Sequence, residues 1–342
     1  MGRRSEEGAS EGRGLQGKPT TLADVATAAG VAISTVSRSF TNPGRVNVRT
    51  RERIERVAAE LGYQPNVLAR ALESGRTRTL GLVVSDVTNP HFFGLIRGAE
   101  HQAATAGYTL LLGDAQQSPQ TERAAIGRFS GFVDGFILAA SRLPTRELAP
   151  TLGGRPVVLV NRESAGIASV TTDHVEGPRQ IVEHLHSLGH RRLVFLGGPR
   201  ESWSGAKRWR AVREAAHTLG MAAAVAGPFP VSIEGGPAAA DAALGLDATA
   251  VIAHNDLLAI GALKRFTERG IRIPRDISVV GFDDIFGADF CAPPLTTLAG
   301  PLEEVGRTAV SMLLAGETHL ARRVALPSHL KIRASTGPAA DG

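Results

Sequence analysis

Between Thr21 and Arg38 the apolar positions follow the period of two short helices. Thr21 can cap the first helix reciprocally with Asp24, and Gly30 permits a sharp turn after it. From Ile33 to Phe40 a second helix keeps Val36 inward and polar side chains outward. The pattern predicts a helix-turn-helix whose second helix, too short to be stable alone, suits the major groove of DNA. The apolar face of the first helix is formed, at spacings i, i+3, i+4 and i+7, by Leu22, Val25, Ala26 and Ala29.

A third helix follows, with Asn47 as its N-cap and Gly62 at its end. Several arginines crowd this region, which suits contacts to DNA phosphates. The alternative is an ordinary helical subdomain with solvated arginines, and the agreement of cap, turn and charge signals favours DNA binding. The expected buried face of this helix comprises Ile54, Val57, Ala58 and Leu61, and the arginines are Arg45, Arg49, Arg51, Arg53 and Arg56.

From Leu80 onward short β-rich runs alternate with amphipathic helices, several of which end in glycine. Strands that are apolar throughout and alternate with helices indicate parallel sheets covered on both faces. Their number predicts two Rossmann-like lobes, in which ligands bind beyond the carboxyl ends of the strands. The expected strands are Leu80–Val84, Thr109–Leu112, Gly135–Leu138, Val157–Val160, Leu193–Leu196, Ala250–Ala253 and Ser278–Val280, and the terminating glycines are Gly107, Gly189, Gly220 and Gly270.

Composition narrows the class of protein. The 342 residues suit a small headpiece plus a two-lobed core, and the formal charge of +5 favours a nucleic-acid partner. The single cysteine, Cys291, excludes an internal disulfide and a cysteine-based metal cluster, so we expect neither metal nor cofactor. No apolar run is long enough to cross a membrane. Residues 1–18 lack the apolar region of a secretory signal, so we expect a disordered tail and a cytoplasmic protein.

Motifs in a fixed order resemble one family along residues 20–336. They read GVAISTVSR, TRERIERVAAELGYQPNVLARAL, GLVVSDVTNPHFFGLIRGAE, HNDLLAIGAL, ISVVGFDD, PPLTTL and RAST. Each motif alone is weak, but in this order they resemble the lac-repressor (LacI/GalR) family of bacterial transcription regulators. The resemblance implies a helix-turn-helix headpiece on an α/β core of two Rossmann-like lobes, of the periplasmic-binding-protein type, with three crossings between the lobes.

The resemblance also implies a division of the chain. Residues 1–18 would be the tail, 19–64 the DNA-binding domain, 65–78 the hinge helix and linker, and 79–342 the effector-binding and dimerisation domain. We expect an N-lobe of about 79–174 plus the final segment, and a C-lobe of about 175–300. The absence of a long heptad segment after RAST favours a dimer over a tetramer.

The DNA contacts are expected in the headpiece and the hinge. Ile33 and Ser34 occupy the two variable base-reading positions, and Ile33 offers only apolar contact, for example to a thymine methyl group. Ala32 stands where relatives have a capping serine, and Ser34 could cap a slightly shorter helix instead. The residues to which the resemblance assigns DNA contacts are Thr21, Ile33, Ser34, Thr35, Ser37, Arg38, Asn47, Asn66, Ala69 and Leu72.

In the hinge, Pro65 can start a short helix. The resemblance implies that this helix lies in the minor groove, where Leu72 would unstack a base step beside Ala69. From the residues alone, packing of Leu68 and Leu72 against the core is the favoured interpretation, and the resemblance reverses it. We expect Leu72→Ala to weaken specific DNA binding and to spare effector affinity, and equal operator affinity in the variant and the parent would refute this.

The candidate effector site consists of polar and aromatic residues, most of them at strand ends. Asn255 could equally cap the next helix; Phe92 or Phe229 alone would more readily be core, and Arg208 alone a surface ion pair. Their joint placement favours a shared cleft for a carbohydrate or nucleoside. Two departures from the family pattern are Ala206, where an arginine is common, and Gly300, where many relatives have a glutamine. The expected effector-binding residues are Asp86, His91, Phe92, Asn161, Arg208, Phe229, Asn255 and Asp283.

Together these features predict a ligand-responsive, sequence-specific transcriptional regulator. It would act as a homodimer on a pseudo-palindromic site in double-stranded DNA and respond to a sugar or nucleoside, and the choice of repressor over activator follows family habit. One alternative is a solute-binding protein, against which the headpiece argues. The other is a Rossmann-like enzyme, but GxGxxG after a strand, a P-loop, HExxH and a nucleophile elbow are all missing.

Overall fold

The computed structural model describes residues 20–41, 43–63, 75–316 and 321–340. The chain divides into two compact units, Met1–Thr77 and Arg78–Gly342. The first unit contains the helices α1 (Leu22–Ala29), α2 (Ile33–Thr41) and α3 (Val48–Glu60), with the short 3₁₀ turn η1 (Pro43–Arg45) before α3.

The start and end of α1 follow the predicted capping. The Thr21 hydroxyl accepts from the Asp24 backbone N–H at 3.3 Å, and the Asp24 carboxylate accepts from the Thr21 N–H at 2.8 Å. Gly30 ends the helix with φ +63°, a conformation that costs glycine little. Asn47 caps α3 by accepting from the Arg49 N–H at 3.0 Å. These predictions from the sequence are confirmed.

Two predictions about the headpiece are wrong. Leu61 is 40% exposed because it is the C-cap of α3, after which the chain turns through Gly62; Tyr63 packs on Phe40 instead, with ring centroids 5.8 Å apart. Ser34 is not an N-cap, since α2 already begins at Ile33. The small core holds the other expected residues, with Leu22 and Val57 partly buried around Val25, Ala26, Ala29, Val36, Ile54 and Ala58.

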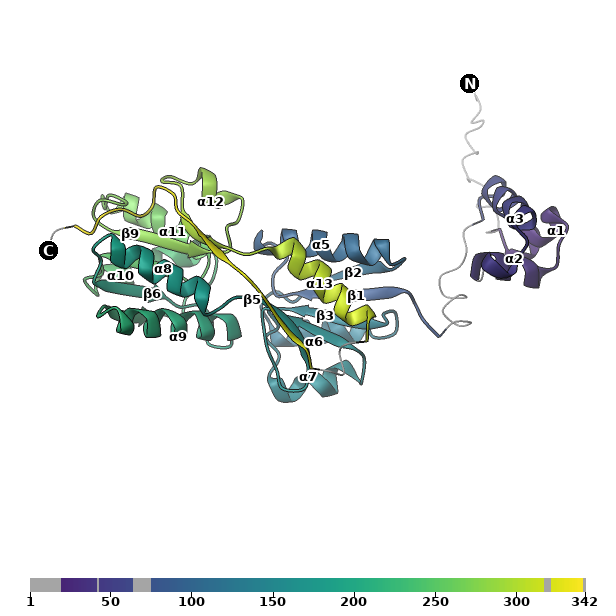
Figure 1. Cartoon of the computed structure of the whole chain (residues 1–342), viewed down its shortest axis with the longest axis horizontal. Helices are drawn as coiled ribbons and strands as arrows, with labels where there is room; N and C mark the ends of the chain where they lie inside the picture. The colour runs from purple at the N-terminus through teal and green to yellow at the C-terminus, as the bar shows by residue number, and fades with distance from the viewer. Residues whose placement is uncertain (1–19, 42, 64–74, 317–320, 341–342) are drawn as a thin grey trace, which may run out of the picture. The chain divides into compact units, whose positions relative to one another are not determined.

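The second unit consists of two lobes, each built on a six-stranded sheet of the described residues (Figure 1). The N-lobe sheet is parallel throughout and has the order β11 (Arg323–Leu326), β5 (Ala168–Thr172), β4 (Val157–Val160), β3 (Gly135–Ala139), β1 (Thr79–Val84) and β2 (Thr109–Asp114). In the C-lobe sheet only the edge strand β12 is antiparallel, and the order is β12 (His329–Lys331), β10 (Thr296–Ala299), β9 (Ser278–Phe282), β8 (Ala250–Ala253), β6 (Arg192–Leu196) and β7 (Ala222–Ala226).

Helices cover both faces of each sheet, as apolar parallel strands require. In the N-lobe, α5 (His91–Thr105) and α13 (Leu302–Leu314) pack together on one face, and α6 (Pro119–Phe129) and α7 (Thr145–Leu152) on the other. A Cβ at Gly98 of α5 would lie 2.0 Å from the Glu303 carbonyl oxygen, so the first pair touches backbone to backbone. In the C-lobe, one face carries α8 (Glu176–Ser187) and α9 (Trp203–Thr218), and the other carries α10 (Gly236–Leu244), preceded by the 3₁₀ turn η2 (Ile233–Gly235), and α11 (Asp256–Glu268).

All seven expected strands are present, with bounds that differ by at most two residues. Five further strands were not predicted, namely β5, β7, β10, β11 and β12. β7 is alanine-rich and β11 and β12 are short, so their sequences lack the continuous β-branched pattern that marks a buried strand. Each of the predicted helix-terminating glycines has positive φ.

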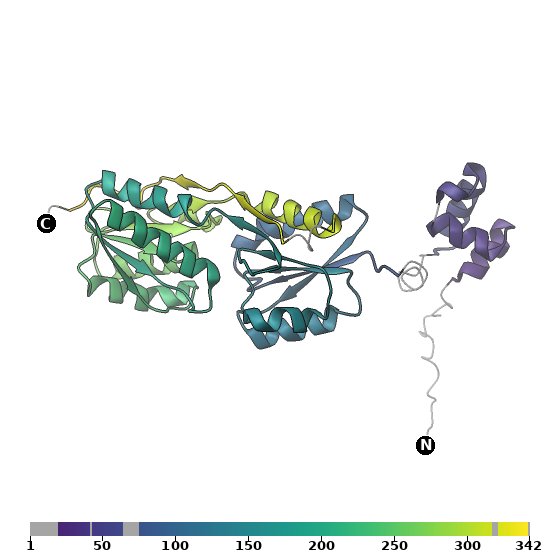
Figure 2. The ribbon, with the colours of Figure 1, turned by 60° about the horizontal axis from the view of Figure 1, so that its bottom comes forward.

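The chain passes between the lobes three times within the described residues, after β5, after β10 and after β11. The expectation that the final segment belongs to the N-lobe is only partly right. Helix α13 and β11 do, but the chain then crosses to add β12 to the C-lobe sheet. In Figure 2 this last crossing runs alongside the lobes toward the C-terminus. No helix in the described part of the chain is long and apolar enough to cross a membrane.

Candidate functional site

A cleft between the lobes collects side chains that follow the carboxyl ends of strands in both lobes. Asp86 comes after β1 and Asn161 after β4 of the N-lobe, whereas Asn255 comes after β8 and Asp283 after β9 of the C-lobe. The space between these side chains is about 440 Å³, part of which is open solvent. Of the eight expected effector residues, all but Phe229 line this cleft.

The centre of the cleft is a buried ion pair that joins α9 to the end of β9. The Arg208 guanidinium donates from Nη2 to Asp283 Oδ1 at 3.0 Å, and from Nη1 to the His254 carbonyl oxygen at 2.7 Å. It also lies 4.4 Å above the ring of Phe282. Both charged side chains are buried, at 8% and 6% exposure. The alternative of a surface ion pair for Arg208 is therefore wrong.

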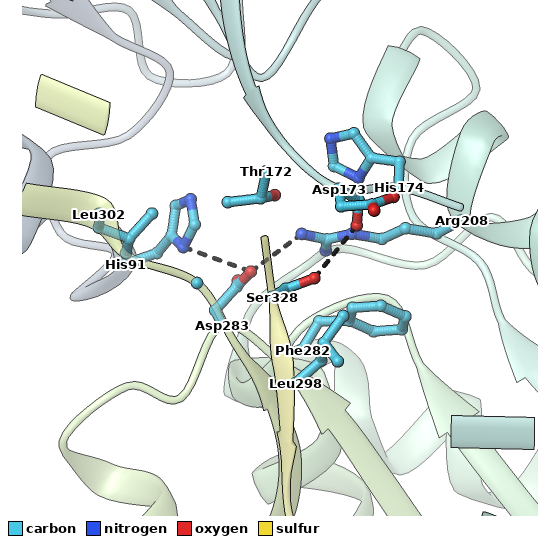
Figure 3. A pocket seen from close by; sticks show the side chains of 11 residues that line it. His91, Thr172, Asp173, His174, Arg208, Phe282, Asp283, Leu298, Leu302 and Ser328 are labelled. Carbon is cyan, nitrogen blue, oxygen red and sulfur yellow. Dashed lines mark hydrogen bonds and ion pairs between the residues drawn. The ribbon is translucent and has the colours of Figure 1, made fainter. Parts of the chain in front are cut away.

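His91, at the start of α5, brings the N-lobe to this pair (Figure 3). Its Nδ1 lies 3.3 Å from Asp283 Oδ1, and the Asn161 amide lies 3.1 Å from its Nε2. If the amide donates there, neutral His91 carries its proton on Nδ1, facing the carboxylate. Burial lowers the pKa of His91, Asp283 opposes this, and Arg208 adds to the lowering, so the ring is neutral near pH 7. Asp283 is thus approached by one side chain from each lobe, although the His91 Nδ1 contact does not have the geometry of a hydrogen bond.

Asp86 and Asn255 are positioned by hydrogen bonds to their own segments and to neighbouring loops. Asp86 accepts from the Thr88 backbone N–H at 2.9 Å and from the Gln117 amide at 3.3 Å. Asn255 caps α11 through the Leu258 N–H at 3.0 Å, which confirms the capping interpretation, and its amide donates to the Val231 carbonyl oxygen. The Asn255 side chain therefore caps α11 and also lines the cleft.

Aromatic side chains contribute less than expected. Phe92 is 2% exposed and belongs to the N-lobe core as well as the cleft wall. Phe229 is not among the lining residues, because it packs against the C-lobe core, and Val231 lines the cleft two residues later. The GPFPV segment therefore contributes an aliphatic side chain where an aromatic one was expected.

Two charged or titratable lining residues were not singled out from the sequence. Arg142 lies three residues after β3, and His254 directly follows β8, so the strand-end rule could have found both. Burial is the main cause that lowers the pKa of His254 well below its usual value, and the charges of Arg208 and Arg142 add to it. His254 is therefore neutral, and its Nδ1 has no hydrogen-bond partner among the residues that the structure describes.

A second, smaller cavity lies at the three crossings between the lobes (Figure 3). Thr172 and His174 come from the first crossing, Gly300 from the second and Ser328 from the third. A Cβ at Gly300 would lie 2.6 Å from Thr172 Cγ2, so a glutamine could not replace this glycine without displacing Thr172. Burial, reinforced by the charge of Arg208, lowers the pKa of His174 to about 3.

The headpiece offers its second helix as an interaction face. Ile33 is 55% exposed at the start of α2, Ser34 and Arg38 are exposed beside it, and Thr35 and Ser37 are half-buried. Thr21 and Asn47 serve as helix caps. The remaining expected contacts, Asn66, Ala69 and Leu72, lie outside the described residues.

Comparison with known proteins accounts for both units. A family model described as "Bacterial regulatory proteins, lacI family" matches residues 21–66, and one described as "Periplasmic binding protein-like domain" matches residues 182–336. The repressor CytR of Escherichia coli is 34% identical over 304 residues, which cover 86% of this chain and 89% of that protein. The chain belongs to the LacI family of bacterial regulatory proteins. Its members are DNA-binding transcriptional regulators, so the enzyme alternative does not apply.

Other members of the LacI family extend the match over nearly the whole chain. The regulator CelR of Thermobifida fusca is 32% identical over 338 residues, which cover 92% of this chain and 98% of that protein. The lac repressor dimer bound to operator and the anti-inducer ONPF superposes with a TM-score of 0.83 at 28% identity, covering 94% of this chain and 100% of the other. A CelR–cellobiose complex gives a TM-score of 0.68 at 31% identity, covering 92% and 99%.

Proposed function

We propose that this protein is a ligand-responsive transcriptional repressor that binds a pseudo-palindromic operator as a homodimer and senses a sugar or related small metabolite. The observation that carries the proposal is the Asp283 cluster. In it Arg208 of one lobe and His91 of the other meet on one carboxylate, in a chain that also has a helix-turn-helix headpiece. A regulator of bacterial DNA acts in the cytoplasm, where its operator lies.

The related structures support the effector class and the assembly. One neighbour is a lac repressor dimer on its operator, another is a regulator complexed with cellobiose, and a third LacI-family regulator has bound ribose. Acceptors at Asp86, Asn161 and Asp283, beside the apolar wall of Phe92, suit the hydroxyl groups and the ring face of such ligands. The headpiece argues against a free-standing solute-binding protein.

The proposed mechanism couples the cleft to the operator through the angle between the lobes. An effector that bridges Asp283 and Asn161 would favour one relative position of the lobes over another, because the three crossings allow the lobes to rotate. In our division of the chain, residues 19–64 bind DNA, residues 65–78 transmit the change and residues 79–342 sense the effector and dimerise. Coupling of this kind amounts to about 1–3 kcal/mol and is reciprocal.

Selection of genomic fragments by the purified protein, at near-physiological salt and with sequencing of the retained DNA, tests the proposal. Enrichment of one pseudo-palindrome with half-sites about one helical turn apart is the expected result. The same fragment then serves in release assays with sugars and nucleosides. Equal retention of all fragments, lost as salt rises and unchanged by metabolite pools, would mean nonspecific phosphate binding and would contradict the proposal.

A further inference from the structure

Arg142 places a buried guanidinium group in the wall of the cleft, where no described residue accepts a hydrogen bond from it. The residue is 8% exposed and lines the cleft on the N-lobe side, after β3. Its backbone N–H donates to Glu122 Oε2 at 2.8 Å. Among the residues that the structure describes, none accepts a hydrogen bond from the guanidinium, and Nε is buried and unpaired. A buried, unpaired charge is unfavourable, so such a group in a native site needs an explanation.

A second arginine near this loop, Arg162, is also buried, but its guanidinium group forms several hydrogen bonds that hold the loop in place. It is 7% exposed and fully engaged, with Nη1 donating to the carbonyl oxygens of Ser141 and Leu143, and Nη2 to Thr145 Oγ1 at 3.2 Å. It therefore ties the loop after β3 to the start of α7. Arg142 is in the same loop and equally buried, yet it makes none of these bonds.

One carboxylate serves both arginines. Burial lowers the pKa of Arg142 and of Arg162, and in each case the negative charge of Glu122 is the largest opposing cause. The two guanidinium groups thus share one buried carboxylate. In the rest of the cleft Arg208 forms an ion pair with Asp283, whereas Arg142 forms no ion pair with any residue that the structure describes.

The charge of Arg142 acts across the cleft, on the C-lobe. After burial and the charge of Arg208, it is a further cause of the lowered pKa of His254, which follows β8. The negative charge of the exposed Glu201, before α9, raises the pKa of Arg142. Both residues are described by the structure, and they do not form an ion pair with each other. Arg142 lines the cleft between the lobes, and its charge acts on the opposite wall of that cleft.

We propose that Arg142 binds an anionic group, a phosphate or a carboxylate, on a polyhydroxylated effector. The inference rests on the proposed function and specifies the class of ligand for the same cleft. A guanidinium fork matches the paired oxygens of either anion, and the strength of such bonds rises in a site that excludes water. The acceptors Asp86, Asn161 and Asp283 would bind the hydroxyl groups of this anionic effector, as they would those of a neutral sugar.

The first test compares matched neutral and anionic ligands on the full-length protein. Titration calorimetry would measure the affinities of ribose, ribose 5-phosphate and ribonate, and of glucose, glucose 6-phosphate and gluconate, and release of the selected operator fragment would be followed in parallel. We expect at least one anionic member to bind about tenfold tighter or more than its neutral counterpart. The phosphate and carboxylate arms show which anion the site takes.

Two variants make the first test specific to Arg142. Arg142→Gln should bring the anionic and neutral affinities together, and Arg142→Lys should retain part of the difference. Arg146→Gln removes an exposed charge four residues later and should leave the difference unchanged. The inference is overturned if no anionic member exceeds its neutral counterpart, or if Arg142→Gln leaves the difference intact. Operator release by a neutral sugar would then preserve the proposed function while rejecting the anion.

The second test needs no ligand and asks whether Arg142 is structural. Because its guanidinium has no partner to lose, ligand-free Arg142→Gln should melt at the same temperature as the parent protein or higher. Arg162→Gln, which loses its bonds to Ser141, Leu143 and Thr145, should melt clearly lower. An equal drop for both variants would make Arg142 a structural residue and overturn the inference.

Discussion

The buried pair of Arg208 and Asp283 yields a quantitative prediction. Replacing Arg208 by methionine leaves the Asp283 carboxylate 6% exposed, beside neutral His91, whose Nδ1 lies 3.3 Å from Oδ1 without forming a hydrogen bond. Removing one partner of a buried ion pair costs about 3–5 kcal/mol, because the other charge stays desolvated. The free energy of unfolding should fall by that amount, and the melting temperature by roughly 6–20 °C at about 2–4 °C per kcal/mol.

A double-mutant cycle separates the pair from its surroundings. Asp283→Asn alone leaves the Arg208 charge buried and should also destabilise the fold. The double variant replaces the charges by neutral groups of similar size, so it should recover much of the loss, with a coupling energy of up to about 3 kcal/mol. The assay is urea unfolding followed by tryptophan fluorescence, since both tryptophans, Trp203 and Trp209, lie in α9 beside Arg208.

The exposed pair of Arg265 and Asp241, 2.8 Å apart on the C-lobe surface, is the matched control. Arg265→Met should cause a much smaller loss, because solvent screens the remaining charge. The single variants in the cleft should still bind operator DNA but no longer respond to effector. Equal losses for Arg208→Met and Arg265→Met, or no coupling in the cycle, would refute the argument that burial of this pair organises the cleft.

Three further predictions, with four variants, test other parts of the structure. Burial lowers the pKa of His174 from 6.5 to about 3, so between these pH values the unfolded chain binds a proton at this residue and the folded chain does not. The free energy of unfolding should therefore fall by up to about 1.4 kcal/mol per pH unit from pH 6.5 toward pH 3. His174→Gln should reduce this slope in urea unfolding, and an identical slope in variant and parent would contradict the prediction. Gly98→Ala would put a Cβ 2.0 Å from the Glu303 carbonyl oxygen and should destabilise the N-lobe by about 1–3 kcal/mol. Gly127→Ala, in open space in α6, should stabilise it by about 0.5–1 kcal/mol. If calorimetry gave the Gly98 variant the higher melting temperature, the close approach of α5 and α13 would be disproved. Ala32→Ser would supply the missing cap of α2 and should raise the headpiece stability by about 1 kcal/mol, and unchanged thermal melting by circular dichroism would exclude this.

The headpiece was largely predictable because its signals are local. Thr21, Gly30 and Asn47 act within a few residues of themselves, so caps and turns are readable without the tertiary structure. The two errors, Leu61 and Ser34, fall at helix ends, where one residue decides whether a side chain faces the core or solvent.

Most of the residues that line the cleft could be predicted from the order of strands, but the others depend on how individual side chains pack. In a parallel sheet the carboxyl ends of strands share an edge, so Asp86 and Asn161 had to lie at one edge of the N-lobe sheet once their strands were recognised. Asp283 lies at the corresponding edge of the C-lobe sheet, and the packing of the two lobes brings it to the same cleft. Phe229 failed because only packing decides whether an aromatic side chain in an irregular segment faces the cleft or the core. The position of Arg142 after β3 was available to the strand-end rule, but its lack of a hydrogen-bond partner among the described residues depends on tertiary contacts that no local pattern reveals.

By itself the sequence determined the helix-turn-helix, the seven strongest strands, the two-lobed class and the family, since each of these rests on local periodicity or on residues in a fixed order. The tertiary structure alone decided three things. It paired Arg208 with Asp283 and left Arg142 unpaired, and it carried the last strand, β12, back to the C-lobe. Each depends on contacts between segments far apart in the chain, and burial, which sets the energy of such contacts, exists only once the lobes have folded.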